Sequence, residues 1–299
     1  MALQSWGVWP AAVYSMARRA PKYRTGLPLK DRKNTATRRR LDLAMVRRDL
    51  APSRTQAREF IAAGRVTVNG APAMKASRLV ADGEPVVVAG PPAKFVSRAG
   101  RKLEHALDTF DITVTNRLAL DAGASTGGFT DCLIQRGASH VYAIDVGTNQ
   151  LHERVRALPT VTSLENCDIR SVSIDTFRDD PAAAGGFDLV VGDLSFISTR
   201  GLLEHLSTLL APGGDMVVLI KPQFEAGRQE VSRGRGVITD RDVWVAVLHA
   251  FIDEATRVSL EVVDLALSPI TGGKGNVEFL GHLRRSDILE SVNETPEAT

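Results

Sequence analysis

The sequence has little cysteine and no long apolar run. Cys132 and Cys167 are the only cysteines in 299 residues, which excludes a disulfide framework and a zinc site built on cysteine pairs, and we expect no metal site. This cysteine usage fits a reducing cytosol, so we expect a cytoplasmic protein. No window approaches the roughly 18 uncharged apolar residues of a membrane span. The first residues also lack the leading positive charge of a signal peptide, and Met16 is an alternative start to Met1.

Charge is divided unevenly along the chain, although the formal net charge is only +2. Residues 1–100 carry 19 Lys and Arg against 6 Asp and Glu, whereas the remaining residues carry 18 against 29. A basic first third joined to an acidic body predicts that the first part docks on a polyanion. Residues 17–40 hold ten Lys and Arg without apolar periodicity, so we expect a basic, disordered extension over residues 1–38.

A small patterned module follows this extension. Apolar residues recur at helical spacing at Leu43, Val46 and Leu50, which predicts a first helix. The capping box Ser53-Arg-Thr-Gln56 starts a second helix, and Asn69-Gly70 is a strong hairpin signal between short apolar alternations. The sequence therefore predicts two helices and a hairpin with further strand.

The run from Ser53 to Gly70 resembles the RNA-binding module first known from the ribosomal protein S-four family. The resemblance covers residues 39–88 and implies a small α+β RNA-binding fold. Arginine suits this role because its guanidinium group binds phosphate through two parallel hydrogen bonds. A solvated helix face is the alternative interpretation of the same charges. The candidate RNA-binding residues are Arg39, Arg40, Arg47, Arg48, Arg54, Arg58, Arg65 and Arg98.

The domain organisation follows from composition and periodicity. The RNA-binding module is expected over residues 39–90, a Pro-containing linker over 91–96, a catalytic domain over 97–285 and a tail over 286–299. Strand and helix patterns alternate in the catalytic domain, which predicts an α/β, Rossmann-like, mostly parallel sheet with helices on both faces. A helix is expected over residues 96–107, and a mobile loop rich in glycine and arginine over 227–236. The strands are expected over 117–123, 141–146, 161–165, 187–197, 215–221, 258–268 and 277–283.

A glycine-rich turn is the most informative segment, Leu120-Asp-Ala-Gly-Ala-Ser-Thr-Gly-Gly-Phe-Thr130. Such a turn lets the backbone approach a ligand, and the helix that follows presents free N–H groups. Eighteen residues after Gly127, an apolar run ends in Asp145, where a carboxylate accepts hydrogen bonds from a ribose diol. The carboxylate of Asp121 repels a phosphate and suits a cationic sulfur, so we expect S-adenosylmethionine (SAM) rather than a dinucleotide. Any strand–glycine–helix turn looks similar, which is the alternative.

Four ionisable residues are expected at the carboxyl ends of the strands, where such sheets bind ligands. Asp193 and Lys221 each follow a buried apolar run, Glu278 lies in a late strand, and Lys102 lies on the helix before the first strand. Lysine at the end of a buried strand is costly unless it is paired, so we favour a role in the site over an extended lysine at the sheet edge. Because a neighbouring lysine and burial both favour the neutral amine, Lys221 is the candidate general base.

This set of residues fits methylation of a hydroxyl, since an alcohol is a weak acid that needs a base. Methylation of a base amino group would be better served by an Asn/Asp-Pro-Pro-aromatic turn, and the corresponding segment reads Asp193-Leu-Ser-Phe-Ile-Ser198. Methylation at carbon five of a pyrimidine usually needs a cysteine nucleophile, and neither cysteine is well placed.

Four segments, Asp-Ala-Gly-Ala-Ser-Thr-Gly-Gly-Phe, Asp-Leu-Ser-Phe-Ile-Ser, Leu-Ile-Lys-Pro-Gln-Phe-Glu and Gly-Asn-Val-Glu, follow Val-Ser-Arg-x-Gly-x-Lys-Leu. Together they resemble the TlyA family of ribosomal-RNA (cytidine-2′-O)-methyltransferases, often called hemolysin A. The resemblance spans residues 39–285 and implies an FtsJ-like SAM-dependent domain joined to the RNA-binding module. It implies a catalytic set at Lys102, Asp193, Lys221 and Glu278. It also implies a SAM pocket at Gly123, Ser125, Thr126, Gly127, Gly128, Phe129 and Asp145, with Asp168 on the adenine side.

The implied partner is ribosomal RNA or a ribosomal subunit, with no membrane partner, and a monomer is favoured. Methylation of tRNA or another structured RNA is the alternative within the enzyme class. A hemolysin or cytolysin would need a spanning or strongly amphipathic segment, and we find none. A non-catalytic RNA-binding assembly protein is the remaining alternative, although all four ionisable positions hold the residue types of the catalytic set.

Overall fold

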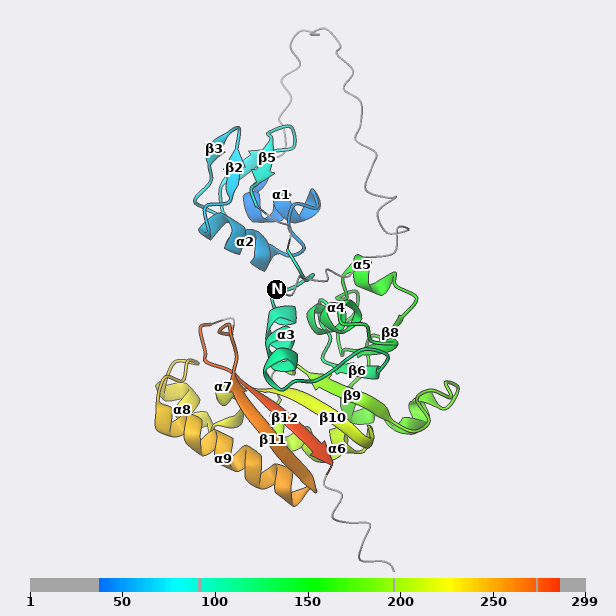
Figure 1. Cartoon of the computed structure of the whole chain (residues 1–299). Helices are drawn as coiled ribbons and strands as arrows, with labels where there is room; N and C mark the ends of the chain where they lie inside the picture. The colour runs from blue at the N-terminus through cyan, green and yellow to red at the C-terminus, as the bar shows by residue number, and fades with distance from the viewer. Residues whose placement is uncertain (1–37, 91–92, 196, 273, 286–299) are drawn as a thin grey trace, which may run out of the picture. The chain divides into compact units, whose positions relative to one another are not determined.

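A computed structural model describes residues 38–90, 93–195, 197–272 and 274–285 (Figure 1). The predicted basic extension, both candidate start methionines and the predicted tail therefore lie outside the described residues, except for Arg38. Arg38 already belongs to a strand, so regular structure begins before the predicted first helix.

The first module contains short helices and strands whose ends follow from its polar residues. Its elements are β1 (Arg38–Arg40), α1 (Leu41–Arg47), α2 (Arg54–Ala62), β2 (Val66–Val68), β3 (Ala71–Pro72), β4 (Leu79–Ala81) and β5 (Val86–Val88). Ser53 caps α2 as predicted, because its side chain accepts a hydrogen bond from the N–H of Gln56 at 3.2 Å. Asn69 and Gly70 have φ angles of 54° and 77°, as a tight hairpin turn requires.

The buried face of α1 differs from the face expected from the sequence. Leu41, Ala44 and Met45 are buried, whereas Leu43 is 40% exposed. Both sets of residues have helical spacing, so periodicity alone does not distinguish them. The antiparallel pairing of β1 with β4 fixes how the chain enters α1 and thereby decides which face meets the core.

The larger domain is built on a seven-stranded sheet, which confirms the predicted Rossmann-like α/β class. Its strands are β6 (Leu118–Ala122), β7 (His140–Ile144), β8 (Val161–Leu164), β9 (Phe187–Gly192), β10 (Leu210–Ile220), β11 (Leu260–Leu267) and β12 (Phe279–Arg285). The order is β11-β12-β10-β9-β6-β7-β8, and only β12 runs antiparallel to its neighbours. Residues that follow β6, β7, β9 and β10 therefore gather at the edge of the sheet where β12 begins.

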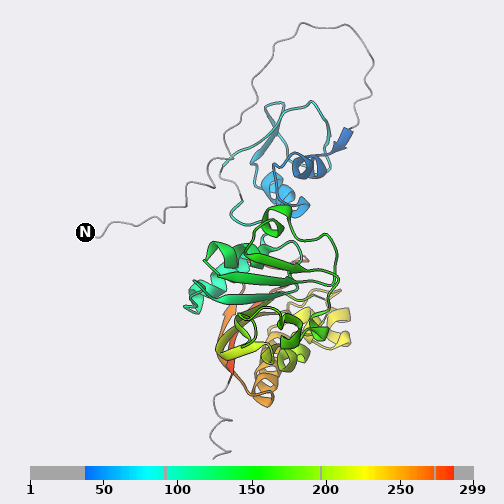
Figure 2. The ribbon, with the colours of Figure 1, turned by 90° about the vertical axis from the view of Figure 1, so that its right-hand side faces the viewer.

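Helices cover both faces of this sheet (Figure 2). One face carries α3 (Ala99–Thr109), which begins three residues later than predicted, and α4 (Gly128–Gln135). The other carries α6 (Leu203–Ser207) and α9 (Arg241–Arg257), with Phe251 fully buried between α9 and the sheet. The remaining α-helices of the described ranges are α5 (Glu153–Arg156), α7 (Pro222–Glu225) and α8 (Arg228–Arg233).

Two predicted boundaries were wrong in ways that bear on the site. The strand expected to continue to residue 197 ends at Gly192, so Asp193 lies directly at its carboxyl end. The segment expected to be a mobile loop contains α8. Its glycines flank this helix instead of interrupting it, since Gly227 is the N-cap and Gly234 the C-cap.

At the opposite edge of the sheet, a buried carboxylate joins two strands and the segment that enters a third. Asp215 of β10 lies 2.6 Å from Arg117, 2.7 Å from His282 and 2.6 Å from Arg284. Burial raises the pKa of Asp215, but the hydrogen bonds from these three side chains outweigh burial and hold that pKa well below its usual range. The network joins β10 to β12 and to the residue that precedes β6.

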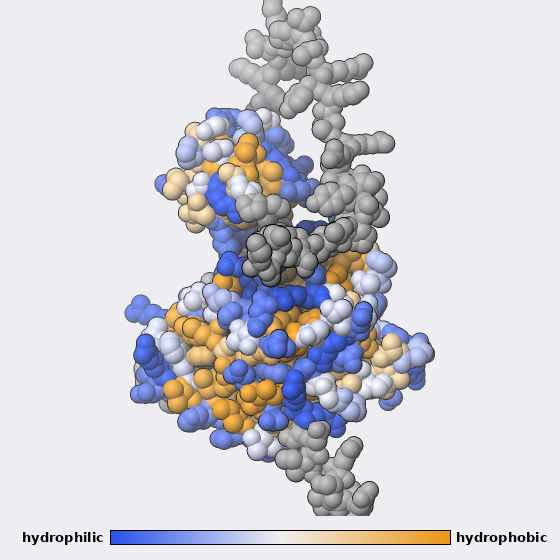
Figure 3. All heavy atoms as spheres, viewed as in Figure 1, coloured by the Kyte–Doolittle hydropathy of each residue, from blue (hydrophilic) through white to orange (hydrophobic). Residues whose placement is uncertain are grey.

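The outer strand β11 leaves apolar side chains exposed. Val263 is 40% and Leu267 is 58% exposed, and Figure 3 shows apolar surface over β11 and β12. Within the ranges that the structure describes, no helix is both long and apolar enough to cross a membrane.

Candidate active site

The glycine-rich turn between β6 and α4 is held by a carboxylate from the next strand. Ser125 has a φ of 47°, in the left-handed region that residues other than glycine rarely adopt. Its N–H donates to Oδ2 of Asp145 at 2.8 Å, and the N–H of Gly147 donates to Oδ1 at 2.7 Å. Asp145 follows β7 and therefore orders the turns after both β6 and β7. Each of its carboxylate oxygens retains capacity to accept a further hydrogen bond.

A cavity of about 440 Å³ lies beside this turn, within the usual size range of ligand sites. Of the predicted cofactor residues, those that line it are Gly123, Ser125, Asp145 and Asp168. Thr126 and Phe129 line a smaller adjoining cavity of about 140 Å³. Gly127 and Gly128 line neither and shape the turn instead. A Cβ at Gly128 would lie 2.1 Å from Oγ of Ser97, so only glycine fits there.

Asp121 and Asp168, both predicted cofactor residues, already have partners in the protein. Asp121 is fully buried, lines neither cavity, and accepts a hydrogen bond from the hydroxyl of Thr130 at 2.6 Å. Burial raises the pKa of Asp121 to about 7, although the hydrogen bonds of Thr130 oppose this shift. Asp168 pairs with Arg170 at 2.5 Å, and this hydrogen bond lowers the pKa of Asp168 to about 2.

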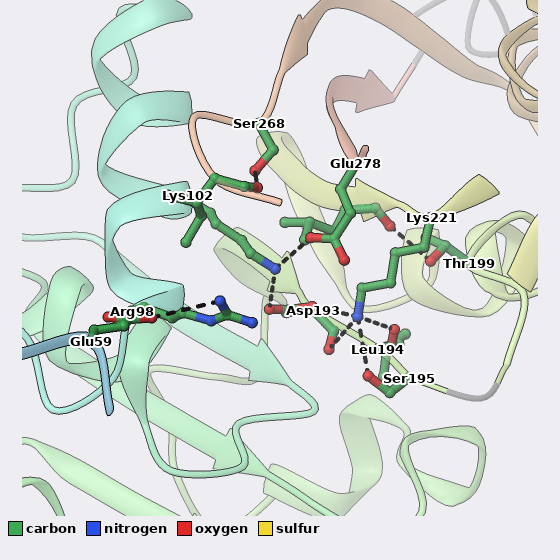
Figure 4. A network of polar contacts seen from close by, with 12 residues as sticks. Glu59, Arg98, Lys102, Asp193, Leu194, Ser195, Thr199, Lys221, Ser268 and Glu278 are labelled. Atoms are coloured by element: carbon green, nitrogen blue, oxygen red, sulfur yellow. Dashed lines mark hydrogen bonds and ion pairs between the residues drawn. The ribbon is translucent and has the colours of Figure 1, made fainter. Parts of the chain in front are cut away.

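The structure brings together the four ionisable residues of the predicted catalytic set (Figure 4). Asp193 follows β9, Lys221 follows β10, Lys102 lies on α3, and Glu278 precedes β12. Nζ of Lys221 is 2.5 Å from Oδ1 of Asp193. Nζ of Lys102 is 3.3 Å from Oδ2 of Asp193 and 2.6 Å from Oε2 of Glu278. The four groups thus form an unbroken chain of ion pairs with alternating charge.

Asp193 is the centre of this chain. Burial raises its pKa, but the charges and hydrogen bonds of Lys221 and Lys102 outweigh burial and keep the pKa below its usual value. Nζ of Lys221 also donates to the carbonyl of Leu194 at 2.7 Å and to the hydroxyl of Ser195 at 3.1 Å. Neither contact was predictable from the sequence, because residue types do not show the direction of a loop backbone.

Glu225 connects the loop after Asp193 to the helix after Lys221. Its carboxylate accepts hydrogen bonds from the hydroxyl of Ser198 at 2.6 Å and from the N–H of Thr199 at 2.7 Å. The segment Lys-Pro-Gln-Phe-Glu is visible in the sequence, but nothing in it shows that the glutamate faces this loop. The position of Lys221 relative to Asp193 is therefore fixed by their own ion pair and by the contacts of Glu225.

A second cavity, of about 690 Å³, contains the catalytic set. All four ionisable residues line it, together with the predicted RNA-binding residue Arg98. Asp193 and Ser195 line both this cavity and the cavity beside the glycine-rich turn. The two cavities therefore meet at the residues that hold Lys221.

In the first module, three of the predicted RNA-binding arginines surround one buried carboxylate. Asp42 is fully buried and accepts hydrogen bonds from Arg40 at 3.0 Å, Arg54 at 3.1 Å and Arg58 at 3.2 Å. Burial raises the pKa of Asp42, but the three guanidinium donors outweigh burial and hold it well below its usual range. The arginine side chains are 40–54% exposed, so they form a positive surface anchored from beneath.

The other candidate RNA-binding arginines differ in their surroundings. Arg48 donates to two backbone carbonyls at 2.7 Å each, and Arg65 donates to another at 2.7 Å, so both stabilise the module itself. Arg39 forms an ion pair at 2.8 Å, and Arg47 is exposed on α1.

Comparisons with known proteins match both parts of the chain. The model of FtsJ-like methyltransferases matches residues 95–285, and the S4 domain model matches residues 39–86. The 16S/23S rRNA (cytidine-2′-O)-methyltransferase TlyA of Mycobacterium tuberculosis is 43% identical over 251 residues, which cover 83% of this chain and 91% of that protein. Hemolysin A of Brachyspira hyodysenteriae is 39% identical over 81% of this chain and 98% of its own length. The solved structure of a Streptococcus thermophilus protein has 38% identity and a TM-score of 0.67, covering 85% of this chain and 90% of that one.

Proposed function

The chain belongs to the FtsJ-like methyltransferase family, and from this premise we propose that it methylates the ribose 2′-hydroxyl of a cytidine in ribosomal RNA with SAM. The main support for this proposal is that the two cavities meet at Asp193 and Ser195. One cavity has the glycine-rich turn and Asp145, which suit a nucleoside, and the other has two lysines, which suit a nucleotide. The name of the Mycobacterium tuberculosis relative supports cytidine in ribosomal RNA as the substrate.

The residues beside the glycine-rich turn fit SAM as the cofactor. Asp145 retains acceptor capacity for both hydroxyls of a ribose diol, and Arg170, the basic residue that lines this cavity, is already paired with Asp168. Oδ1 of Asp121, buried beneath the turn, has no hydrogen-bond partner among the described residues, and a nearby cation would stabilise its ionised form. When bound, SAM supplies an electrophilic methyl group on a cationic sulfur.

We assign the proton of the 2′-hydroxyl to Nζ of Lys221. The carbonyl of Leu194 and the hydroxyl of Ser195 orient this amine, and a substrate hydroxyl that replaces either contact lies within hydrogen-bond reach of it. An amine accepts a proton only in its neutral form, so the proposal requires Lys221 to enter the reaction neutral and to carry the hydroxyl proton away. Lys102, paired with Glu278, keeps Asp193 in position.

The first module supports an RNA substrate. The arginines around Asp42 present three guanidinium groups whose charge is offset by only one carboxylate. Exposed guanidinium groups bind phosphate oxygens, and binding of this kind weakens steeply as salt rises. An affinity for ribosomal RNA that falls with salt is therefore part of the proposal.

Methyl transfer to purified RNA tests the proposed function. The full-length protein is incubated with methyl-labelled SAM and with either ribosomal subunits or tRNA from cells that lack the gene. We expect label in ribosomal RNA as 2′-O-methylcytidine, and Asp193→Asn should abolish transfer while SAM still binds. Label confined to tRNA would contradict the ribosomal substrate, and label on a base would contradict transfer to the ribose.

A further inference from the structure

One wall of the larger cavity has no role in the proposed reaction. This wall is α7, whose residues Gln223 and Phe224 line the cavity next to Lys221. Oε1 of Gln223 is enclosed and has no hydrogen-bond partner among the residues that the structure describes. Buried polar atoms in proteins nearly always have a partner, and this orphaned amide oxygen would gain one if the Gln223 side chain turned towards a donor on a substrate in the cavity.

The position of Phe224 indicates which part of the substrate meets this wall. The centre of its ring lies 5.8 Å from Nζ of Lys221. If the base of a nucleotide bound at this amine extends towards α7, it meets Phe224 and Gln223. RNA-binding proteins contact unstacked bases in this way, with an aromatic ring against the base and polar groups at its pairing edge.

We propose that Gln223 recognises the base of the methylated nucleotide by accepting a hydrogen bond from its exocyclic amino group. The inference rests on the proposed function and deepens it, because it assigns a residue to the choice of cytidine over uridine. Cytosine presents an amino donor at carbon four, whereas uracil presents a carbonyl oxygen at the same place. A carbonyl oxygen would face the orphaned Oε1 of Gln223 as a second acceptor, and no hydrogen bond would form.

The test crosses enzyme variants with substrate variants. Single-turnover methyl transfer is measured on transcribed ribosomal RNA that carries either cytidine or uridine at the mapped target position, with wild-type protein and with Gln223→Met. We expect wild-type protein to prefer the cytidine RNA by roughly tenfold or more. Gln223→Met should lose about that factor on the cytidine RNA and change little on the uridine RNA, so that the preference disappears.

Gln223→Glu provides the matched control, since a carboxylate keeps the acceptor and offers no donor to uridine. It should retain the preference for cytidine, and SAM binding by calorimetry shows that each variant is folded. If Gln223→Met fails to bind SAM, the ratio of rates for Gln223→Glu decides. Equal losses on both RNAs, or a Gln223→Glu protein without preference, would overturn the inference. A wild-type protein that methylates neither RNA would instead contradict the proposed function.

Discussion

Two buried carboxylates, one in the first module and one in the larger domain, each form ion pairs with several basic side chains. Asp42 holds three arginines and Asp193 holds two lysines, and in both cases the cations keep the pKa of the carboxyl below its usual value despite burial. The difference lies in the cations. The arginine side chains around Asp42 are 40–54% exposed, whereas Lys102 and Lys221 are 7% and 6% exposed.

This difference matches the proposed roles, a surface that binds RNA around Asp42 and a reaction site around Asp193. A guanidinium group stays protonated in proteins, so exposed arginines on a buried anchor provide a constant attraction for phosphate. Lysine can serve as a proton acceptor where arginine cannot, so the buried lysines beside Asp193 are the candidates for proton exchange. Exchanging the two kinds of cation is therefore the most direct way to test the comparison.

The largest effect is expected for Lys221→Arg. The variant keeps the positive charge beside Asp193 but cannot accept a proton, so single-turnover methyl transfer should fall by about 10²–10⁴-fold. Binding of SAM and RNA should change little. The measurement is transfer from labelled SAM to ribosomal RNA at several pH values.

Lys94→Arg is the matched control for this experiment, because Lys94 is exposed and lines neither cavity. It should transfer methyl groups at the wild-type rate. If Lys221→Arg also retained that rate, position 221 would contribute only positive charge, and the proton acceptor would have to be another group.

The next largest effect is expected for Asp42→Asn, which removes the anchor of the arginine cluster. Loss of charged hydrogen-bond partners typically costs about 1.5–3 kcal/mol, and the free energy of unfolding should fall by that amount. The pKa of Asp42 is lowered in the folded state, so its contribution is present above the unfolded pKa of about 4 and is lost as pH falls. Because the folded-state pKa of Asp42 lies below pH 3, denaturant unfolding should show the full difference between wild type and variant at pH 7 and a smaller difference at pH 3.

Asp82→Asn removes an exposed partner of Arg39 and serves as the control, with an expected change below about 1 kcal/mol. A change as large as that of Asp42→Asn would show that the burial of the carboxylate is not what matters.

A smaller effect is expected from Asp121, a buried carboxylate that forms no ion pair within the described part of the chain. Burial raises its pKa to about 7, so it ionises as pH rises through 7. The ionised form attracts the cationic sulfur of SAM and not the neutral sulfur of S-adenosylhomocysteine. The ratio of the two affinities should therefore rise by roughly threefold to tenfold between pH 6 and pH 8.

Asp121→Asn stays neutral, so its ratio should rise less than that of wild type over this range. Titration of the ligands' own amino groups affects the curves of both proteins equally. Parallel curves for wild type and variant would show that Asp121 does not act on the sulfur.

The smallest effect is expected for Arg54→Lys. The variant keeps its charge but loses the planar donor group, so RNA affinity should fall by less than about threefold at moderate salt. Arg54→Ala should lower the slope of log affinity against log salt by about 1, as loss of one phosphate contact predicts. Equal losses for both variants would indicate that the geometry of the guanidinium matters more than its charge.

The sequence predicted those site residues that directly follow apolar runs. Asp145, Asp193 and Lys221 each end a strand of a mostly parallel sheet, and the carboxyl ends of such strands meet at one edge. Lys102 was predicted from its place on the helix before the first strand. The general position of the site was therefore predictable from periodicity and topology.

Contacts between distant loops were not predictable in this way. Glu225 reaches Ser198 and Thr199, and Gln223 keeps an orphaned oxygen, only because of how α7 packs against the loop after β9. Leu43 was wrong as a core residue of α1 for a similar reason, since two faces of this helix have apolar residues at helical spacing and the pairing of β1 with β4 decides which is buried. Residue types fix local structure, whereas these features depend on the tertiary fold.

The segment that leads into the antiparallel strand β12 supplies the last of the four ionisable residues to be synthesised. Glu278 enters the site with β12, which lies between β10 and β11 in the sheet, and its partner Lys102 is 176 residues earlier in the chain. A growing chain folds from its N-terminal part onwards, so Lys102 is synthesised long before Glu278. The two side chains can pair only when the last strand is inserted. A truncation before β12 would therefore leave the buried ammonium group of Lys102 without its closest partner.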